Sequence, residues 1–232
     1  MLNIEVTEHA GLMPRHSRIY REIISLVKSC SNDLSMFIYT KKSELFDYLS
    51  EREKIRTELL LDSVGAVDEN RKILILAILP ETGEFLGFAI CSPNLVQSDS
   101  ASITMIAVKE SFRKKGVFRE IIKHIQSKFS HVTLTCKPEL VSLYEKFGFN
   151  ASGVFQTHIC MSRGNETGHG KLISVDDEYV MRHPLVLKKY KKLVEKIGKI
   201  RVDAAIAKWQ KDFSLAESEA RDFYAGLAKK LT

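Results

Sequence analysis

Apolar residues recur every three or four positions near the start of the chain, which is the spacing of a helix with one buried face. The residues that carry this pattern are Ile19, Ile23, Ile24 and Val27. They predict an amphipathic helix over about residues 17–30. A short strand is predicted at residues 36–39, and a second helix is predicted around Ser43, Phe46 and Leu49.

The pattern then changes to that of buried strands. Residues 71–79 and 84–91 are apolar runs separated by Pro80, Glu81, Thr82 and Gly83. Because Pro and Gly favour a turn, the two runs predict a β-hairpin. Residues 103–108 and 131–136 predict two further strands.

Two helices and a last strand complete this part of the chain. The first helix lies between the two further strands and has one apolar face, formed by Phe118, Ile121, Ile122, Ile125 and Phe129. The second is short and ends at Gly148, a residue type common just after a helix; its apolar residues are Leu140, Leu143, Tyr144 and Phe147. Residues 155–161 predict the last strand. This order indicates an α+β fold with one crossover connection.

The C-terminal part has a different pattern. Residues 163–171 hold three glycines and few apolar residues, which is typical of a linker. Beyond them, apolar residues step by three and four, as in amphipathic or coiled-coil-like helices. Ser214-Leu215-Ala216-Glu217 fits a capping box, so we expect a break near residues 212–214 and two helices.

We therefore expect three parts: a domain over residues 1–162, a linker over 163–183 and C-terminal amphipathic helices over 184–232. The helices either pack on their own domain or form an interface with a protein partner or a second copy of the chain. The pattern itself leaves both alternatives open.

Composition places the chain among globular proteins. Of its 232 residues, 44% are hydrophobic and 28% are charged, which are ordinary values. The longest apolar run, residues 73–79, is too short to span a membrane, and the first 18 residues lack the apolar segment of a secretory signal. We therefore expect no membrane partner. The four cysteines stand far apart, so we expect them to be reduced packing residues of a cytoplasmic protein, and we expect no metal site.

The net charge of +6 is concentrated in one segment. Residues 182–201 contain eight basic residues and one acidic residue, so they carry +7 and the rest of the chain carries −1. Clustered Lys and Arg suit a polyanion such as nucleic acid, whereas their interleaving with apolar positions is typical of the solvated face of a helix. We favour the solvated face, because the chain has no recognisable nucleic-acid-binding motif.

The segment most informative about chemistry is residues 103–149. It contains a strand, a turn with Gly116 and then a helix, and the free N–H groups of a first helical turn bind phosphate where glycine lets the backbone come close. Arg113, Lys114 and Lys115 add three positive charges. Taken alone, these residues are better explained as a solvated basic turn, and it is the segment downstream that favours phosphate binding.

Two motifs in this segment resemble those of the GNAT superfamily of N-acetyltransferases. Arg113-Lys114-Lys115-Gly116-Val117-Phe118 resembles its coenzyme-binding motif, which is Arg or Gln, two residues, Gly, one residue, then Gly or Ala. Leu143-Tyr144-Glu145-Lys146-Phe147-Gly148-Phe149 matches a later Leu-Tyr-Glu-Lys run that ends in Gly-Phe. The resemblance covers roughly residues 71–161 and does not include the C-terminal helices.

The resemblance implies an α/β sandwich with a mixed, mostly antiparallel sheet that is splayed between its fourth and fifth strands, with acetyl-CoA as co-substrate in the opening. The backbone of Ile106, Ala107 and Val108 would hold the pantetheine arm and the thioester, and residues 113–118 would hold the diphosphate. Tyr144 matches the tyrosine that donates a proton or a hydrogen bond to the departing coenzyme A sulfur.

The chain departs from the family pattern at two places. Phe118 stands where a small residue is usual, so either the diphosphate sits differently or Phe118 points into the core. Lys137 and Leu140 stand where Asn and Ala are frequent, seven and four residues before Tyr144, and the missing Asn removes a pantetheine contact.

The resemblance also implies direct attack of an acceptor amine on the thioester, with the oxyanion stabilised by backbone N–H groups of the fourth strand. A lysine-type amine with a pKa of ~10.4 would need a general base. Glu84, Glu110, His158 and an ordered water are candidates, and none is assigned as the base. His158 is singled out only as an acceptor-side residue, because the last strands border that side in the family.

The sequence therefore predicts transfer of an acetyl group from acetyl-CoA to the amine of a small molecule or a protein. The alternative is a GNAT-fold binding or assembly protein, catalytically weak, whose C-terminal helices dock on a protein, a particle or nucleic acid. No motif identifies the acceptor.

Overall fold

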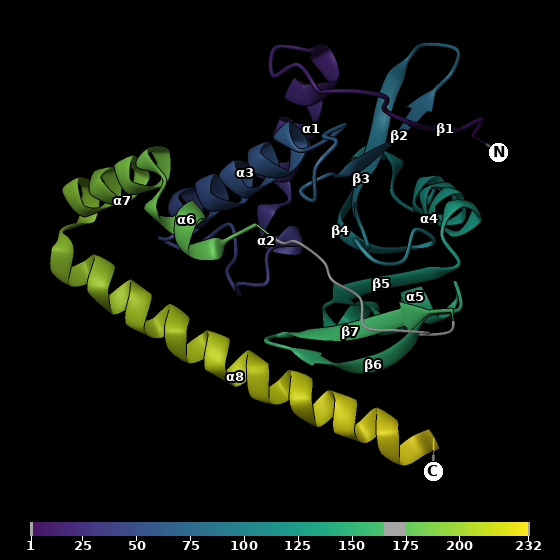
Figure 1. The fold of residues 1–232 in the computed structure, drawn as a ribbon. Helices are drawn as coiled ribbons and strands as arrows, with labels where there is room; N and C mark the ends of the chain where they lie inside the picture. The colour runs from purple at the N-terminus through teal and green to yellow at the C-terminus, as the bar shows by residue number, and fades with distance from the viewer. Residues whose placement is uncertain (1, 165–174, 232) are drawn as a thin grey trace.

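The computed structural model describes residues 2–164 and 175–231. They contain a seven-stranded sheet in the order β1-β2-β3-β4-β5-β7-β6 (Figure 1). The strands are β1 Glu5–Glu8, β2 Ile73–Leu79, β3 Glu84–Pro93, β4 Ser100–Val108, β5 His131–Cys136, β6 Asn150–Phe155 and β7 His158–Arg163. Neighbouring strands are antiparallel except β4 and β5, which are parallel because a helix crosses over between them. This is the expected mixed, mostly antiparallel α+β sheet.

Helices cover both faces of the sheet. They are α1 Arg18–Ser29, α2 Ser31–Leu34, α3 Phe46–Asp62, α4 Val117–Lys128, α5 Val141–Glu145, α6 Asp177–Arg182, α7 Pro184–Ile197 and α8 Lys199–Leu231, with short 3₁₀ helices η1 Glu110–Phe112 and η2 Pro138–Leu140. The predicted N-terminal helix, hairpin and crossover helix are confirmed as α1, β2–β3 and α4. None of the described helices has the length and apolar character needed to cross a membrane.

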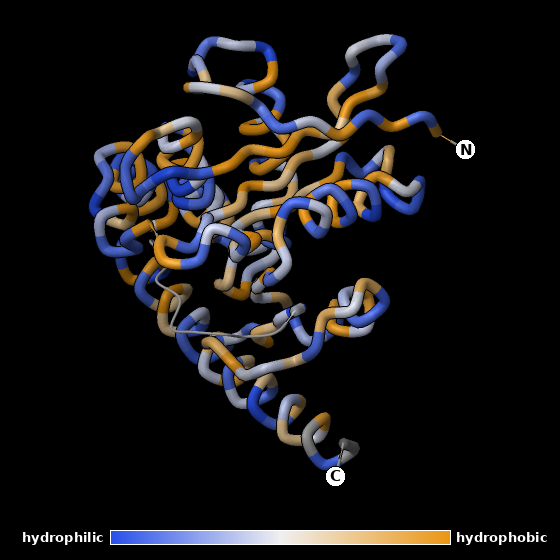
Figure 2. Tube along the Cα trace, turned by 45° about the vertical axis from the view of Figure 1, so that its right-hand side comes forward, coloured by the Kyte–Doolittle hydropathy of each residue, from blue (hydrophilic) through white to orange (hydrophobic). Residues whose placement is uncertain are grey.

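The side chains of β2 show how the sheet separates two apolar layers. Ile73, Ile75 and Ala77 belong to an apolar cluster that includes residues of α4, whereas Leu74 and Leu76 belong to one that includes residues of α1 and α3. Successive residues of a strand point to opposite faces, so a continuous apolar run is the signature of a strand buried on both sides. Figure 2 shows the apolar residues gathered in these central strands.

Two strand predictions need correction, and one strand was missed. Residues 36–39 form no strand, because Phe37 packs on α8 and Tyr39 on α3 instead of joining the sheet. Strand β1, which was not predicted, pairs with β2. The single strand predicted at residues 155–161 is divided, because the chain turns at Gln156 with φ 53° and pairs β6 with β7.

The C-terminal break also differs from the prediction. The chain leaves α7 at Gly198, whose φ of 82° glycine adopts without strain, and α8 then runs without interruption through residues 212–214. Ser214 and Glu217 therefore lie inside a helix and form no capping box. Within the segment 163–183, α6 is a helix, and residues 165–174 of the predicted linker lie outside the described residues.

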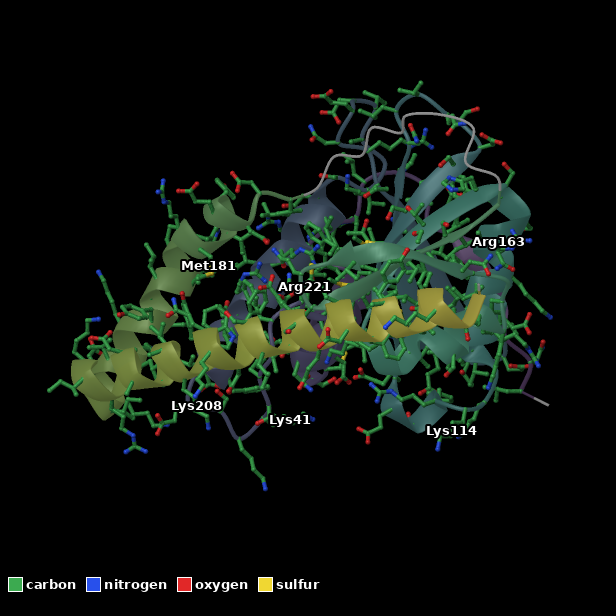
Figure 3. All side chains as sticks on the ribbon, turned by 90° about the horizontal axis from the view of Figure 1, so that it is seen from below. Lys41, Lys114, Arg163, Met181, Lys208 and Arg221 are labelled. Carbon is green, nitrogen blue, oxygen red and sulfur yellow. The ribbon has the colours of Figure 1, made fainter. Side chains whose placement is uncertain are left out.

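The described C-terminal helices pack on their own domain. Figure 3, seen from below, shows α8 crossing the molecule, with Lys208 and Arg221 along it. The first part of α8 covers Tyr39, Leu45 and Leu49, and its later part covers β6 and β7 with a small apolar group, Ala220, Tyr224 and Leu227.

Candidate functional site

A cleft opens where β4 and β5 separate. The two strands pair only over Ser100–Ile103 with His131–Leu134, and β4 continues to Val108 beside β3 alone. The register of β4 against β3 shifts at Thr104, which has no partner opposite it, and the Thr104 hydroxyl shares a 2.8 Å hydrogen bond with that of Ser92. Such a bulge bends a strand, so it turns β4 away from β5 and leaves one edge of β4 facing the cleft.

Predicted site residues from three elements meet in this cleft, which has a volume of about 90 Å³. Ile106 of β4, Tyr144 of α5 and His158 of β7 all line it. Ala107 and Val108 continue the β4 edge as buried residues. Glu84 and Glu110 do not line the cleft: Glu84 lies at the β2–β3 hairpin and Glu110 in η1.

The basic turn before α4 forms a second part of the site. Lys114 and Gly116 both have a positive φ, of 62° and 93°, so the turn curls tightly before α4 begins at Val117. The first N–H groups of a helix have no partner within it, and the helix dipole is positive there. Lys114, Lys115 and Gly116 border a hollow of about 450 Å³ together with Arg119.

The sequence analysis did not identify Arg119 as a site residue, although it lies one turn after Gly116 and so faces the same hollow. Arg113 lies apart from this hollow: its Nη2 is 3.5 Å from Asp33 Oδ2 and its Nε is 3.4 Å from the Val108 carbonyl oxygen. Arg113 therefore joins the basic turn to the end of β4 and to α2.

The two departures from the family pattern have structural explanations. Phe118 points into the core, where its ring packs edge-on at 5.5 Å from both Tyr144 and Phe147. Its ring therefore turns away from the first-turn N–H groups. Lys137 lines the cleft, and its Nζ donates a 2.9 Å hydrogen bond to the carbonyl oxygen of Asn32, which ties α2 to the end of β5.

Tyr144 is held rigidly at the cleft. Its ring packs edge-on between Phe118 and Phe149, with ring centroids 5.5 and 5.8 Å away, and the residue is only 5% exposed. Burial raises the pKa of the Tyr144 hydroxyl well above its usual value, so it keeps its proton at neutral pH. Tyr144 is therefore a hydrogen-bond donor fixed at the cleft wall.

His158 is held in one protonation state. The Thr157 hydroxyl donates a 2.7 Å hydrogen bond to the Met36 carbonyl oxygen, so its oxygen accepts the 3.0 Å hydrogen bond from His158 Nδ1. Burial, with Lys137 and Arg56 nearby, lowers the pKa of His158 to about 4. The ring is thus neutral near pH 7, with its proton on Nδ1 and a lone pair on Nε2.

The cysteine thiols are unsuited to nucleophilic attack. The four cysteines are free, and Cys136 is the one that lines the cleft. Burial raises the pKa of Cys136 to about 12, so the thiolate is scarce at neutral pH. Among residues 2–164 and 175–231, no group of three or more His, Cys, Asp or Glu is arranged to hold a metal ion.

A buried charged cluster behind the cleft was not predicted. Glu53 of α3 has no exposed surface, and its carboxylate accepts hydrogen bonds from the neighbouring Arg52 and, at 2.8 Å, from Ser35. One turn on, the Thr57 hydroxyl lies 3.6 Å from the sulfur of Met105, which lines the cleft. Charged residues inside a helix–sheet interface have no local sequence signal.

Comparison with known proteins decides the family of the central domain. Residues 64–159, which include the bulged β4, the basic turn and Tyr144, match a family model described as an acetyltransferase (GNAT) domain. The chain contains a GNAT acetyltransferase domain. The match supports acyl transfer as the general activity of this GNAT domain, and the splay between the fourth and fifth strands is the one that the family resemblance implies.

One solved structure extends the likeness to the fold. The PaiA N-acetyltransferase from Thermoplasma acidophilum, solved in complex with coenzyme A, aligns with 70% of this chain and 99% of its own at 16% identity, with a TM-score of 0.52. An acyl-CoA N-acyltransferase from Pseudomonas aeruginosa aligns with 70% of this chain and 100% of its own at 14% identity, with a TM-score of 0.47. A search of curated protein sequences found no match.

Proposed function

We propose that the protein transfers an acetyl group from acetyl-CoA to an amine acceptor. The observation that carries this proposal is the cleft between β4 and β5, in which a bulged strand edge, Tyr144 and His158 meet within one GNAT domain. The coenzyme A in the Thermoplasma acidophilum structure supports acetyl-CoA as the donor.

Acetyl-CoA would occupy the two parts of the site. Its pantetheine arm and thioester lie along the β4 edge at Ile106–Val108, where the backbone groups pair with none of the described strands on the β5 side. Its diphosphate lies at the basic turn, where the N–H groups of residues 116–118 and the charges of Lys114 and Lys115 balance its negative charge.

The reaction proceeds by direct attack. The amine nitrogen bonds to the thioester carbonyl carbon, and a β4 backbone N–H stabilises the oxyanion. The carbon–sulfur bond then breaks, coenzyme A leaves as a thiolate, and the nitrogen gives its proton to a water molecule. Tyr144 donates a hydrogen bond to the departing sulfur. Complete proton transfer from Tyr144 to sulfur is uphill by at least about 2 kcal/mol, because a tyrosine has a pKa of ~10 and a thiol ~8.5.

His158 receives the acceptor as a neutral amine. Its low pKa makes it a poor general base for an ammonium group but leaves Nε2 free of a proton, so it accepts a hydrogen bond from the amine N–H. Deprotonation before binding costs roughly 4–5 kcal/mol at pH 7 for a lysine-type amine and about 1.4 kcal/mol for an α-amine with a pKa near ~8. The proposal therefore favours acceptors with a low amine pKa, and turnover that rises with pH.

Two measurements on the full chain test the proposal. Calorimetric titration with acetyl-CoA is expected to show saturable binding, with coenzyme A as the matched ligand that lacks the acetyl group. Release of the coenzyme A thiol is then followed with a panel of α-amines and lysine-type amines. Absence of acetyl-CoA binding would refute the proposal. Binding with no thiol release across the panel would support the alternative of a GNAT-fold binding protein.

A further inference from the structure

A continuous series of contacts connects the C-terminal helices to His158. It begins at the segment Ser35–Met36–Phe37, which lies between α2 and α3 and carries the Met36 carbonyl oxygen. That oxygen is the acceptor for Thr157, and Thr157 in turn fixes the proton of His158. The position of this segment therefore sets the position and tautomer of the His158 ring.

The segment is held from α3. The Ser35 hydroxyl donates to Glu53 at 2.8 Å and accepts from the backbone N–H of Phe37 at 3.1 Å. Glu53 pairs with Arg52, and the side chains of both residues are almost completely buried. A buried ion pair adds little to stability because both charges lose their water, but it fixes the geometry of the groups that it joins.

Arg52 connects this cluster to the C-terminal helices. Its Nη2 donates a 2.6 Å hydrogen bond to Asp177 at the start of α6, and its guanidinium lies 4.1 Å from the centre of the Phe37 ring. The Phe37 ring packs edge-on against two rings of α8, with its centroid 5.0 Å from that of Trp209 and 5.8 Å from that of Phe213. Arg52 and Phe37 are thus held from both α6 and α8.

We propose that α6 and α8 position the acceptor side of the cleft, with Arg52 and Phe37 as the positioning residues that act on His158 through Met36 and Thr157. This inference rests on the proposed function in one respect: the proposed function assigns the His158 side of the cleft to the amine acceptor. It predicts that the C-terminal helices are required for acceptor binding and are not needed for acetyl-CoA binding, because the β4 edge and the basic turn lie outside these contacts.

The test compares full-length variants at the start of the series with matched variants on the same helices. Trp209→Ala removes the ring contact to Phe37, and Asp177→Asn removes the negative charge that pairs with Arg52. Leu215→Ala, at a residue 60% exposed on α8, and Glu178→Gln, at a side chain 67% exposed on α6, are the controls.

The first readout is the ¹⁵N signal of the His158 ring, assigned by its loss in His158→Gln. In the wild type and both controls the ring is expected to stay neutral with its proton on Nδ1 down to about pH 5, because its pKa is about 4. In Trp209→Ala and Asp177→Asn the Nδ1 preference is expected to weaken and the pKa to rise toward its ordinary value. An unchanged His158 signal in both variants, with folding confirmed by circular dichroism, would overturn the inference. If Trp209→Ala fails to fold, Trp209→Phe replaces it.

The second readout separates this inference from the proposed function. The affinity for acetyl-CoA, measured by calorimetry, is expected to stay within about twofold of wild type in Trp209→Ala, while the KM for the best amine of the panel rises tenfold or more. A loss of acetyl-CoA affinity equal to the rise in KM would show a general loss of structure and overturn the inference. If wild-type protein binds no acetyl-CoA, the proposed function fails, and the His158 signal still decides the positioning role.

Discussion

At the scale of single residues, two side chains that line the cleft each have one protonation state near neutral pH. Tyr144 keeps its proton because its hydroxyl is buried, and His158 stays without a second proton because burial opposes its positive charge. One residue is therefore a donor and the other an acceptor across the same neutral pH range. This division of roles fits the acyl transfer proposed above, in which one side chain donates to the departing sulfur and the other accepts from the amine.

Tyr144→Phe tests the donor. The change keeps the ring packing against Phe118 and Phe149 and removes the hydroxyl alone. Turnover is expected to fall about 10²-fold, because the departing thiolate loses its hydrogen bond, while acetyl-CoA affinity stays close to wild type. Thiol release under saturating acetyl-CoA measures the effect. Tyr48→Phe, which removes a hydroxyl 3.9 Å from the Met181 sulfur, is the control, and equal turnover of the two variants would exclude Tyr144 as the donor.

His158 makes stability depend on pH. The folded chain holds its pKa at about 4, whereas the unfolded chain has the ordinary value of 6.5, so the unfolded state binds an extra proton as pH falls through 6.5 toward 4. Lowering the pH from 7 to 5 is therefore expected to reduce the free energy of unfolding by about 2 kcal/mol through this group. Urea unfolding of wild type and His158→Gln at both pH values isolates the effect, since other groups titrate in both proteins. Parallel pH dependence in the two proteins would contradict the assignment.

At the scale of elements, the turn before α4 shows what local sequence can predict. Gly116 and the basic residues beside it are consecutive in the sequence, so a phosphate-binding turn can be predicted there without knowing the fold. The same holds for α1, whose apolar face and Ser17 cap are local. The strand bulge at Thr104 has no such signal, because it appears only in the register of β4 against β3.

The errors at the element scale have the same origin. The capping-box pattern at Ser214 is overridden by the packing of α8 on the domain, with Trp209 and Phe213 held against Phe37. Gln156 adopts a positive φ without being glycine, so the β6–β7 turn carries no Gly or Pro signal. His158 could be placed on the acceptor side only by resemblance, because its state depends on Met36, more than 100 residues away in the chain.

Gly116→Val tests the basic turn as an element. A β-branched residue is strained at a φ of 93°, and the first-turn N–H groups are expected to shift. Affinity for acetyl-CoA, measured by calorimetry, is expected to fall at least tenfold. Gly83→Val is the matched control, because Gly83 also has a positive φ, at 65°, but lies in the β2–β3 hairpin away from the cleft. Equal losses in the two variants would show that strain alone, and no diphosphate contact, explains the result.

At the scale of the whole molecule, the C-terminal helices belong to the body of the protein. The predicted division at residues 162 and 184 stays a prediction, but Arg52–Asp177 and Phe37–Trp209 contacts cross it. Four basic residues of the charged segment, Lys188, Lys191, Lys192 and Lys196, are exposed on the side of α7 away from the buried Val186. Three others, Arg182, Lys199 and Arg201, form ion pairs on α6 and α8. This arrangement fits the solvated face favoured from the sequence, and salt-dependent binding to DNA or RNA would contradict it.

The proposed function places acetyl-CoA in the cleft between β4 and β5. A crystal structure of the full chain with acetyl-CoA shows whether the coenzyme binds there. We expect the thioester beside Ile106–Val108, the diphosphate at the N-terminus of α4, and the Tyr144 hydroxyl within hydrogen-bond distance of the sulfur. Coenzyme bound elsewhere on the molecule, or a thioester beyond the reach of Tyr144, would refute this placement.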